Sequence, residues 1–170
     1  SARALGLDTV AVHSEADARA KHVEYADVAV QVGSGSAATT SYLDADAVLE
    51  AIRTGYRHLD CACDYGNEAE VGLAIADVGV PRSELYIASK CWTTTIHKGP
   101  EAVQAQLEKT LKDLGVDYLD LYCIHWPVPG KHVAAYLELE KCRAEGLVKS
   151  IGVSNYAVED VEELLREASI

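Results

Sequence analysis

Apolar positions in most of the chain alternate between short runs typical of buried strands and longer segments with helical spacing. Four of the runs predict strands, over 56–61, 85–91, 118–125 and 148–153. Helices are expected after them, over 68–78, 101–114, 133–144 and 158–168, with a polar loop at 93–99. Such alternation predicts an α/β fold of parallel strands joined by right-handed crossovers, in one sheet of five or six strands.

The first third of the chain has a similar alternation of predicted strands and helices, in shorter segments. Two apolar runs predict strands, and a capping-box pattern that starts at Ser14 predicts a helical turn or more between them. A further helix is expected immediately before residue 56, ended by Gly55. The expected elements are the tail of a helix at 1–7, strands at 9–13 and 26–32, a Gly/Ser loop at 33–36 and the helix at 44–55.

Composition narrows the class of protein. The chain has 170 residues, 49% of them hydrophobic, which is enough for one domain with a substantial core. No apolar run approaches the roughly 20 residues of a membrane span. A net charge of −12 argues against a nucleic-acid partner, because phosphates attract a basic surface. The first residue is Ser and there is no Met, which indicates a fragment or a processed chain.

The five cysteines are an odd number without disulfide spacing, so a reducing compartment, the cytoplasm, is expected. Four of them lie near strand ends, close to His125, which raises the question of a zinc site. However, Cys61 and Cys63 lack the usual two-residue spacing and no second pair follows. We therefore expect buried thiols and no metal.

Polar residues gather where the predicted strands end. Asp60, Lys90 and His125 fall at the carboxyl ends of three strands, and Tyr65 lies in the loop beyond the first. Active sites of parallel α/β folds are built at that edge of the sheet. An aspartate, a tyrosine, a lysine and a histidine at one edge form a proton-transfer set. Two alternatives stay open: a structural Asp60–Lys90 ion pair and a core histidine at 125.

Five blocks carry a family resemblance. In chain order they are Gly-Tyr-Arg-His-Leu-Asp (55–60), Tyr-Gly-Asn-Glu (65–68), Ser-Lys-Cys-Trp (89–92), Ile-His-Trp-Pro (124–127) and Ile-Gly-Val-Ser-Asn-Tyr (151–156). Together they resemble the aldo-keto reductases over about residues 46–170. The resemblance implies about half of a (β/α)₈ barrel, because a complete barrel takes about 250 residues. The segment before it is expected to be Rossmann-like, on a second resemblance described below.

The same resemblance implies reduction of aldehydes or ketones with NADPH, and a small carbonyl compound as substrate. Tyr65 would give a proton to the carbonyl oxygen, with Lys90, Asp60 and His125 as its partners. A tyrosine titrates near 10, and a neighbouring ammonium favours its phenolate. The resemblance also implies that Asp60, Ser154 and Asn155 contact the cofactor and that Trp92 and Trp126 line the substrate pocket.

Residues 2–51 resemble instead the N-terminal region of biotin carboxylases, without that family's catalytic residues. This predicts two segments, 1–45 and 46–170, in a chimera. Half a barrel lacks most of the loops with which the family holds its dinucleotide, so weak dinucleotide binding is expected. It also leaves edge strands open, so self-association through an open edge is expected. Two other functions stay open: a non-catalytic truncated chimera, and a nucleotide-binding fragment of a biotin-dependent carboxylase.

Overall fold

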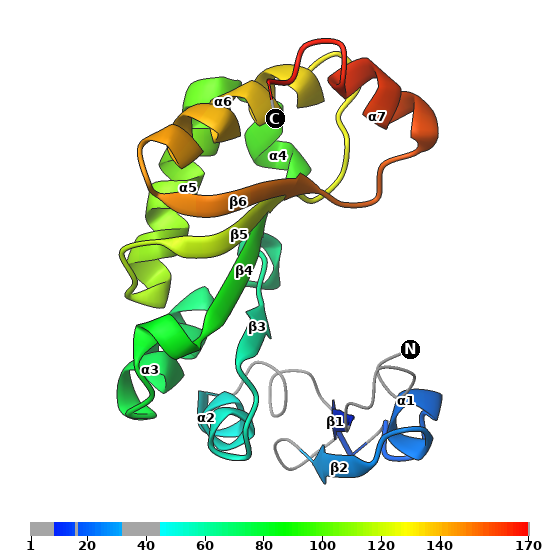
Figure 1. Cartoon of the computed structure of the whole chain (residues 1–170), viewed down its shortest axis with the longest axis vertical. Coiled ribbons are helices and arrows are strands. Elements are labelled where there is room, and N and C mark those ends of the chain that lie inside the picture. Colours follow the sequence, from blue (N-terminus) through cyan, green and yellow to red (C-terminus); the bar gives the residue numbers. More distant parts are fainter. Residues whose placement is uncertain (1–8, 16, 32–44, 170) are drawn as a thin grey trace.

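The computed structural model describes residues 9–15, 17–31 and 45–169. Its main sheet has four parallel strands, and their spatial order follows the sequence, β3-β4-β5-β6 (Figure 1). Strands that succeed one another without a reversal are the pattern of a (β/α)₈ barrel, so the predicted partial barrel is confirmed. The strands are β3 (His58–Asp60), β4 (Tyr86–Cys91), β5 (Leu119–Ile124) and β6 (Val148–Val153).

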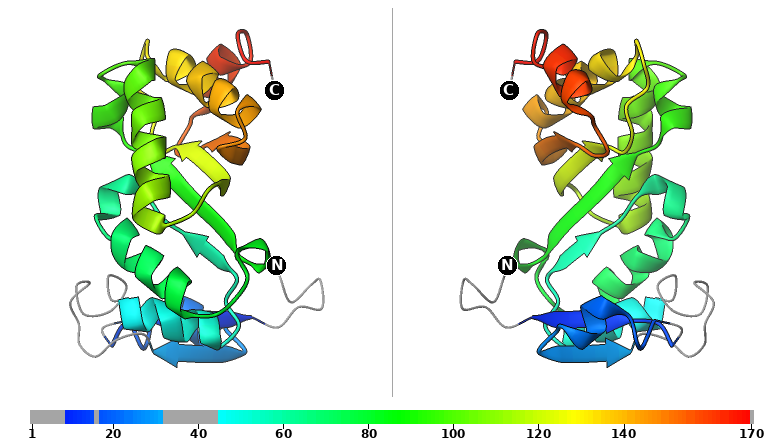
Figure 2. Two further views of the ribbon diagram at one scale, coloured as in Figure 1. Left: turned by 90° about the vertical axis from the view of Figure 1, so that its left-hand side faces the viewer. Right: turned by 90° about the vertical axis from the view of Figure 1, so that its right-hand side faces the viewer.

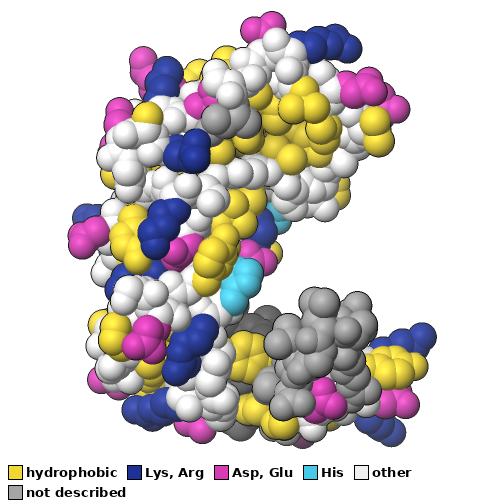
Figure 3. All heavy atoms as spheres, viewed as in Figure 1, with side chains coloured by type: hydrophobic (Ala, Val, Ile, Leu, Met, Phe, Trp, Pro, Cys, Tyr) yellow, Lys and Arg dark blue, Asp and Glu magenta, His cyan; other side chains and the backbone are white. Residues whose placement is uncertain are grey.

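Helices connect these strands and cover one face of the sheet, whereas the opposite side of the molecule is hollowed (Figures 1 and 3). The core lies between the sheet and these helices, where Ile87, Leu107 and Leu139 have no exposed surface. The elements are α2 (Ala45–Arg53), α3 (Glu68–Asp77), α4 (Thr93–Ile96), α5 (Pro100–Leu114), α6 (His132–Ala144) and α7 (Val158–Leu164), with short 3₁₀ turns η3 (Cys63–Tyr65) and η4 (Arg82–Glu84).

Helix α5 shows how closely local sequence sets the bounds of an element. Pro100 occupies its first turn, where a missing N–H costs nothing, and Gly115 ends it in a left-handed conformation with φ of 65°. The apolar stripe is buried as its spacing predicts: Val103, Leu107, Leu111 and Leu114.

The N-terminal part is a small unit of its own. Strands β1 (Val10–His13) and β2 (Val28–Gln31) pair in parallel and form a sheet apart from the main one (Figure 2). The short helix α1 (Lys21–Glu24) lies between them in the chain, which makes a βαβ unit. The strands expected at 9–13 and 26–32 are therefore confirmed, but they do not extend the main sheet.

Three sequence-based expectations need correction. The helical turn expected from Ser14 is a set of turns, and the helix starts only at Lys21. The expected loop at 93–99 contains α4, in which the His97 amide donates to the Thr93 carbonyl at 3.0 Å. Helix α7 ends at Leu164 and not at 168. The chain after it tightens into turns, in one of which the Glu167 amide donates to the Leu164 carbonyl at 3.1 Å. The elements expected at 1–7 and 33–36 lie outside the described residues.

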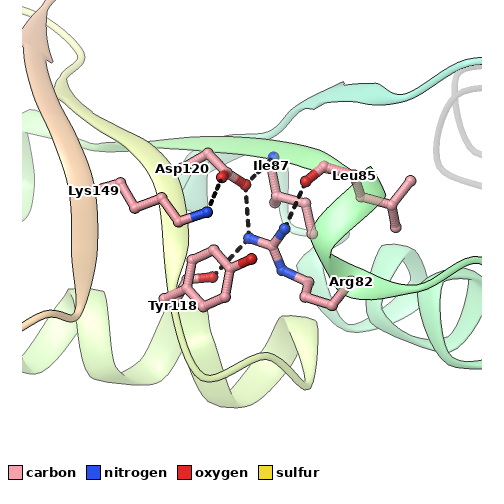
Figure 4. A network of polar contacts seen from close by, with 6 residues as sticks. All are labelled: Arg82, Leu85, Ile87, Tyr118, Asp120 and Lys149. Atoms are coloured by element: carbon pink, nitrogen blue, oxygen red, sulfur yellow. Dashed lines mark hydrogen bonds and ion pairs between the residues drawn. The ribbon is translucent and has the colours of Figure 1, made fainter.

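A buried carboxylate holds together the amino ends of three strand segments, opposite the edge with the polar strand ends (Figure 4). One oxygen of Asp120 accepts hydrogen bonds from Arg82 at 2.8 Å and from the Ile87 amide at 2.9 Å. Its other oxygen accepts from Lys149 at 3.0 Å. Arg82 and Lys149 each also lie 4.1 Å from the centre of the Tyr118 ring. We call these four side chains the Asp120 network.

Free thiols fill apolar sites, as expected. Cys61, Cys91, Cys123 and Cys142 are buried and Cys63 is half-buried. Burial, first among several causes, raises the pKa of both Cys61 and Cys91 to about 12, so these thiols are protonated and unreactive at neutral pH. Within the described ranges, no helix is both long and apolar enough to cross a membrane.

Helix α3 packs against α5 at Gly72, so we expect a side chain at this position to disturb the packing. A Cβ at this position would lie 2.9 Å from the Leu114 carbonyl carbon and closer still to the Asp113 carbonyl oxygen. Helix propensity favours Gly72→Ala by about 1 kcal/mol, but overpacking against backbone costs about 1–3 kcal/mol. We expect the variant to unfold at lower urea concentration than the parent. Ala69→Gly, exposed on the same helix, calibrates propensity, and a stabilised Gly72→Ala chain would contradict the packing argument.

Candidate active site

Strand register places the predicted polar residues on one face of the sheet. Asp60 ends β3 and pairs with Ala88 of β4, two residues before Lys90. Lys90 pairs with Cys123 of β5, two residues before His125. Because side chains two apart on a strand share a face, all three polar side chains project to the same side at the carboxyl edge.

Lys90 is the centre of this group. Its ammonium donates hydrogen bonds to Asp60 Oδ1 at 2.8 Å and to the Cys61 carbonyl oxygen at 3.0 Å. The Lys90 side chain is 13% exposed, whereas that of Asp60 is 58% exposed. Burial opposes the charge on Lys90, but the bond and charge of Asp60, followed by Tyr65, outweigh it and raise the pKa of Lys90 above its ordinary value. The lysine is therefore firmly cationic.

Tyr65 lies over this cation. It ends the turn η3, and its amide donates to the Ala62 carbonyl at 3.0 Å. The Lys90 nitrogen lies 5.4 Å from the centre of the Tyr65 ring, and the His125 ring centre lies 6.0 Å away at an angle of 82°. The structure thus brings the phenol, the amine, the carboxylate and the imidazole to one rim.

His125 is placed by backbone and ring contacts. Its amide donates to the Cys91 carbonyl at 3.0 Å, and its ring meets that of Trp92 edge-on at 4.8 Å. Burial and the nearby charge of Lys90 lower the pKa of His125, so the imidazole is neutral at pH 7. Among the described residues, its buried Nδ1 has no hydrogen-bond partner.

The two tryptophans differ in exposure. Trp92 follows β4, caps α4 and packs on His125, so it reaches the rim directly. Trp126 follows His125 in the chain and is 45% exposed. A broad apolar ring open to solvent beside the rim is suited to contact an apolar substrate, although this role stays a prediction.

Ser154 and Asn155 lie directly after β6. The Ser154 amide donates to the Ile124 carbonyl at 2.9 Å. The Asn155 side-chain amide donates to the His125 carbonyl at 2.8 Å and to Ser154 Oγ at 3.0 Å. Asn155 has φ of 60°, a conformation that asparagine adopts more readily than most residues. These bonds fix both residues beside His125, and their predicted cofactor contacts stay a prediction.

One polar residue near the rim had no predicted role. Glu68, the first residue of α3, is only 5% exposed and hydrogen-bonds Ser89 and Thr110. The sequence does indicate that Glu68 is buried, because it lies one helical turn before the buried Val71 and so falls on the inward face of α3. A cavity of about 350 Å³ lies beside it, whereas a larger one of about 540 Å³ lies away from the rim, near the start of β6.

Comparison with known proteins identifies the family. Residues 29–170 match the profile described as the Aldo/keto reductase family. The glyoxal reductase of Bacillus subtilis is 44% identical over 82% of this chain and 48% of its own length. The NADPH-dependent aldose reductase of Saccharomyces cerevisiae is 38% identical over 82% of this chain and 52% of its own length.

The biotin-carboxylase resemblance of residues 2–51 and the chimera built on it find no support. The family match begins at residue 29, well inside that segment, and so includes part of what was predicted to be foreign. The division into segments 1–45 and 46–170 stays a prediction.

Solved structures agree in both fold and sequence. A crystal structure of an aldo/keto reductase from Brucella melitensis has a TM-score of 0.71 and 41% identity, over 74% of this chain and 49% of that one. The Bombyx mori aldo-keto reductase in complex with NADP has a TM-score of 0.69 and 35% identity, over 74% and 45%. The chain spans about half the length of the relatives it matches. It belongs to the aldo/keto reductase family of oxidoreductases.

Proposed function

We propose that this chain carries the catalytic corner of an enzyme that reduces aldehydes or ketones to alcohols with NADPH. One observation carries the proposal: a half-buried, firmly cationic Lys90, bonded to Asp60 at 2.8 Å, lies 5.4 Å from the centre of the Tyr65 ring. A purely structural ion pair needs no tyrosine beside it. The relatives named as glyoxal reductase and aldose reductase support carbonyl reduction.

Tyr65 is the proton donor in this proposal. The cofactor NADPH would supply the hydride for the carbonyl carbon when bound. The Tyr65 hydroxyl gives its proton to the carbonyl oxygen. The positive charge of Lys90 stabilises the phenolate that remains, and Asp60 keeps Lys90 charged and in place. Solvent then returns a proton to the phenolate, which is accessible because Tyr65 is 45% exposed.

His125 orients the substrate. A neutral imidazole keeps one N–H and donates a hydrogen bond to the carbonyl oxygen as negative charge grows there. The lowered pKa of His125 suits this role, because the ring stays neutral at the pH of the reaction. Trp92 and Trp126 form apolar walls for the carbon skeleton, which favours a small aldehyde or ketone over a highly charged substrate.

The nicotinamide end of NADPH fits the residues at the ends of β3 and β6. Asp60, Ser154 and Asn155 lie at the same edge as Lys90 and offer carboxylate, hydroxyl and amide groups for its carboxamide. The bonds that hold Ser154 and Asn155 beside His125 bring that end close to Tyr65. We expect weak binding, because the chain spans about half of its relatives' length. The free thiols support a reducing compartment, the cytoplasm, as the location in this proposal.

A direct assay tests the proposal. The chain is mixed with NADPH and either glyoxal or an aromatic aldehyde, and NADPH fluorescence and alcohol formation are followed. We expect quenching or enhancement of the NADPH signal on binding, and aldehyde-dependent NADPH oxidation. NADH in a parallel series measures the cofactor preference. No effect on either cofactor at millimolar concentration would contradict the proposal for this chain.

A further inference from the structure

Glu68 is a buried acid placed between the catalytic loop and the core. It is three residues beyond Tyr65, and its residue exposure is 5%. A carboxylate is rarely buried to this extent unless its oxygens find partners. Its position at the first turn of α3 provides partial compensation, because the amino end of a helix favours negative charge.

Each carboxylate oxygen of Glu68 accepts a hydrogen bond from a hydroxyl group. Ser89 Oγ donates to Oε1 at 2.6 Å, and Thr110 Oγ1 donates to Oε2 at 2.9 Å. Both hydroxyl residues have no exposed surface. Ser89 directly precedes Lys90 in β4, whereas Thr110 belongs to α5. One carboxylate therefore ties the start of α3 to the strand that carries Lys90 and to the helix behind it.

The loop before Glu68 presents a ring that is only partly covered. Tyr65 is 45% exposed, so its contacts with His125 and Lys90 cover only part of the ring. Gly66 turns the chain with φ of 70°, and nothing lies within 4 Å of the position its Cβ would take. The cavity of about 350 Å³ is lined by Cys63, Gly66 and Glu68 on one side and by α5 residues, including Lys109, on the other. The loop thus has free volume behind it.

We propose that Glu68 is a positioning residue: its bond to Ser89 fixes the segment 63–68 against the strand that carries Lys90 and so holds the Tyr65 ring beside Lys90 and His125, whereas its bond to Thr110 anchors the start of α3 to α5. The inference rests on the proposed function in one respect, that Tyr65 is the proton donor. Loss of the bridge would let the loop move into the cavity. A displacement of about 1 Å at a reacting group can cost about 100-fold in rate.

The chemistry of Glu68 makes glutamine the informative conservative variant. Burial raises the pKa of Glu68 above its ordinary value, although the hydrogen bonds from Ser89 and Thr110 oppose this. A glutamine avoids burying a charge and keeps the shape. Its carbonyl accepts from one hydroxyl, and its NH₂ donates to the other. Glu68→Gln should therefore restore what Glu68→Ala loses.

Two single-bond variants separate positioning from general stability. Ser89→Ala removes the link to the Lys90 strand, and Thr110→Val removes the link to α5 with little change of shape. A merely structural bridge predicts the same outcome for both variants. Positioning predicts that only Ser89→Ala moves Tyr65 relative to Lys90. Glu70→Ala, exposed on the same helix, serves as the surface control.

The test uses the whole chain with ¹³C-labelled tyrosine and NMR, with the Tyr65 signal assigned from Tyr65→Phe. We expect the nuclear Overhauser effect between the Tyr65 and His125 rings to disappear in Glu68→Ala and Ser89→Ala. The same effect should persist in Glu68→Gln, Thr110→Val and Glu70→Ala. In the aldehyde assay, kcat of Glu68→Ala should fall about 10- to 100-fold with little change in KM.

The outcomes separate this inference from the proposed function. An unchanged Tyr65–His125 Overhauser effect in folded Glu68→Ala overturns the positioning role. If Glu68→Ala does not fold, equal Overhauser effects in Ser89→Ala and Thr110→Val overturn it instead. An effect that is absent in Glu68→Ala and present in Glu68→Gln supports positioning even in a chain without NADPH turnover. That last combination counts against the proposed function alone.

Discussion

Tyr65→Phe is expected to lower kcat for aldehyde reduction by about 10²- to 10⁴-fold, the usual contribution of a positioned acid or base. Phenylalanine keeps the ring that faces His125 at 6.0 Å and removes only the hydroxyl that gives the proton. Ring packing and substrate binding should survive, so KM should change little. Initial rates of NADPH oxidation across aldehyde concentrations measure both constants.

Tyr25→Phe is the matched control, because Tyr25 is 65% exposed and belongs to the N-terminal βαβ unit. The control should leave both constants unchanged. Turnover that Tyr65→Phe leaves equal to that of the parent would show that another group supplies the proton. In that case Lys90, whose ammonium lies next to the ring, becomes the first alternative to examine.

The rim could be predicted from sequence because its residues depend on local features. Asp60, Lys90 and His125 each follow or end an apolar run, and the ends of parallel strands meet at one edge. Tyr65 lies in a loop, where periodicity gives no position. Its place at this edge was predicted because its loop follows the strand that ends at Asp60, the family resemblance implied its role as proton donor, and the structure brings it close to Lys90.

The two buried carboxylates could not be predicted in the same way. Glu68 hydrogen-bonds Ser89 and Thr110, which are 21 and 42 residues away in the sequence. Asp120 hydrogen-bonds Ile87 and Arg82, which are 33 and 38 residues away. A hydrophobic pattern shows that a residue faces inward, but it does not show which distant polar group lies opposite. The division of the strands into two sheets has the same cause, because an apolar run does not show which distant strand it pairs with.

Asp120→Ala is expected to produce the largest loss of stability, about 3–5 kcal/mol, the usual cost of removing one partner of a buried ion pair. The Asp120 side chain is 9% exposed and that of Arg82 is 20% exposed, so the arginine charge would lose its partner in a poorly hydrated site. The buried Ile87 amide would also lose its acceptor. Since domains typically have about 5–15 kcal/mol in total, such a loss is severe.

The position of each cation within the Asp120 network predicts an order of effects in urea unfolding. Lys149 is 57% exposed, so Lys149→Ala should lower the urea midpoint far less than Asp120→Ala does. Asp113→Ala breaks the exposed Lys109–Asp113 pair of α5 and should cost about 0.3–0.5 kcal/mol, which makes it the matched aspartate control. An Asp120→Ala midpoint no lower than that of Asp113→Ala would contradict a buried, structural carboxylate.

At acid pH, the difference in unfolding free energy between the parent and Asp120→Ala should disappear. Burial opposes ionisation of Asp120, but the hydrogen bonds from Ile87, Lys149 and Arg82 outweigh it and lower the pKa of this carboxyl below its ordinary value. A carboxyl with a lowered pKa in the folded state contributes its full stability above the pKa of the unfolded chain. That contribution is lost as the pH falls through the folded-state pKa. Unfolding free energies of both chains at neutral and acid pH should therefore converge at low pH, and a gap that stays constant would place the stabilisation in packing and not in charge.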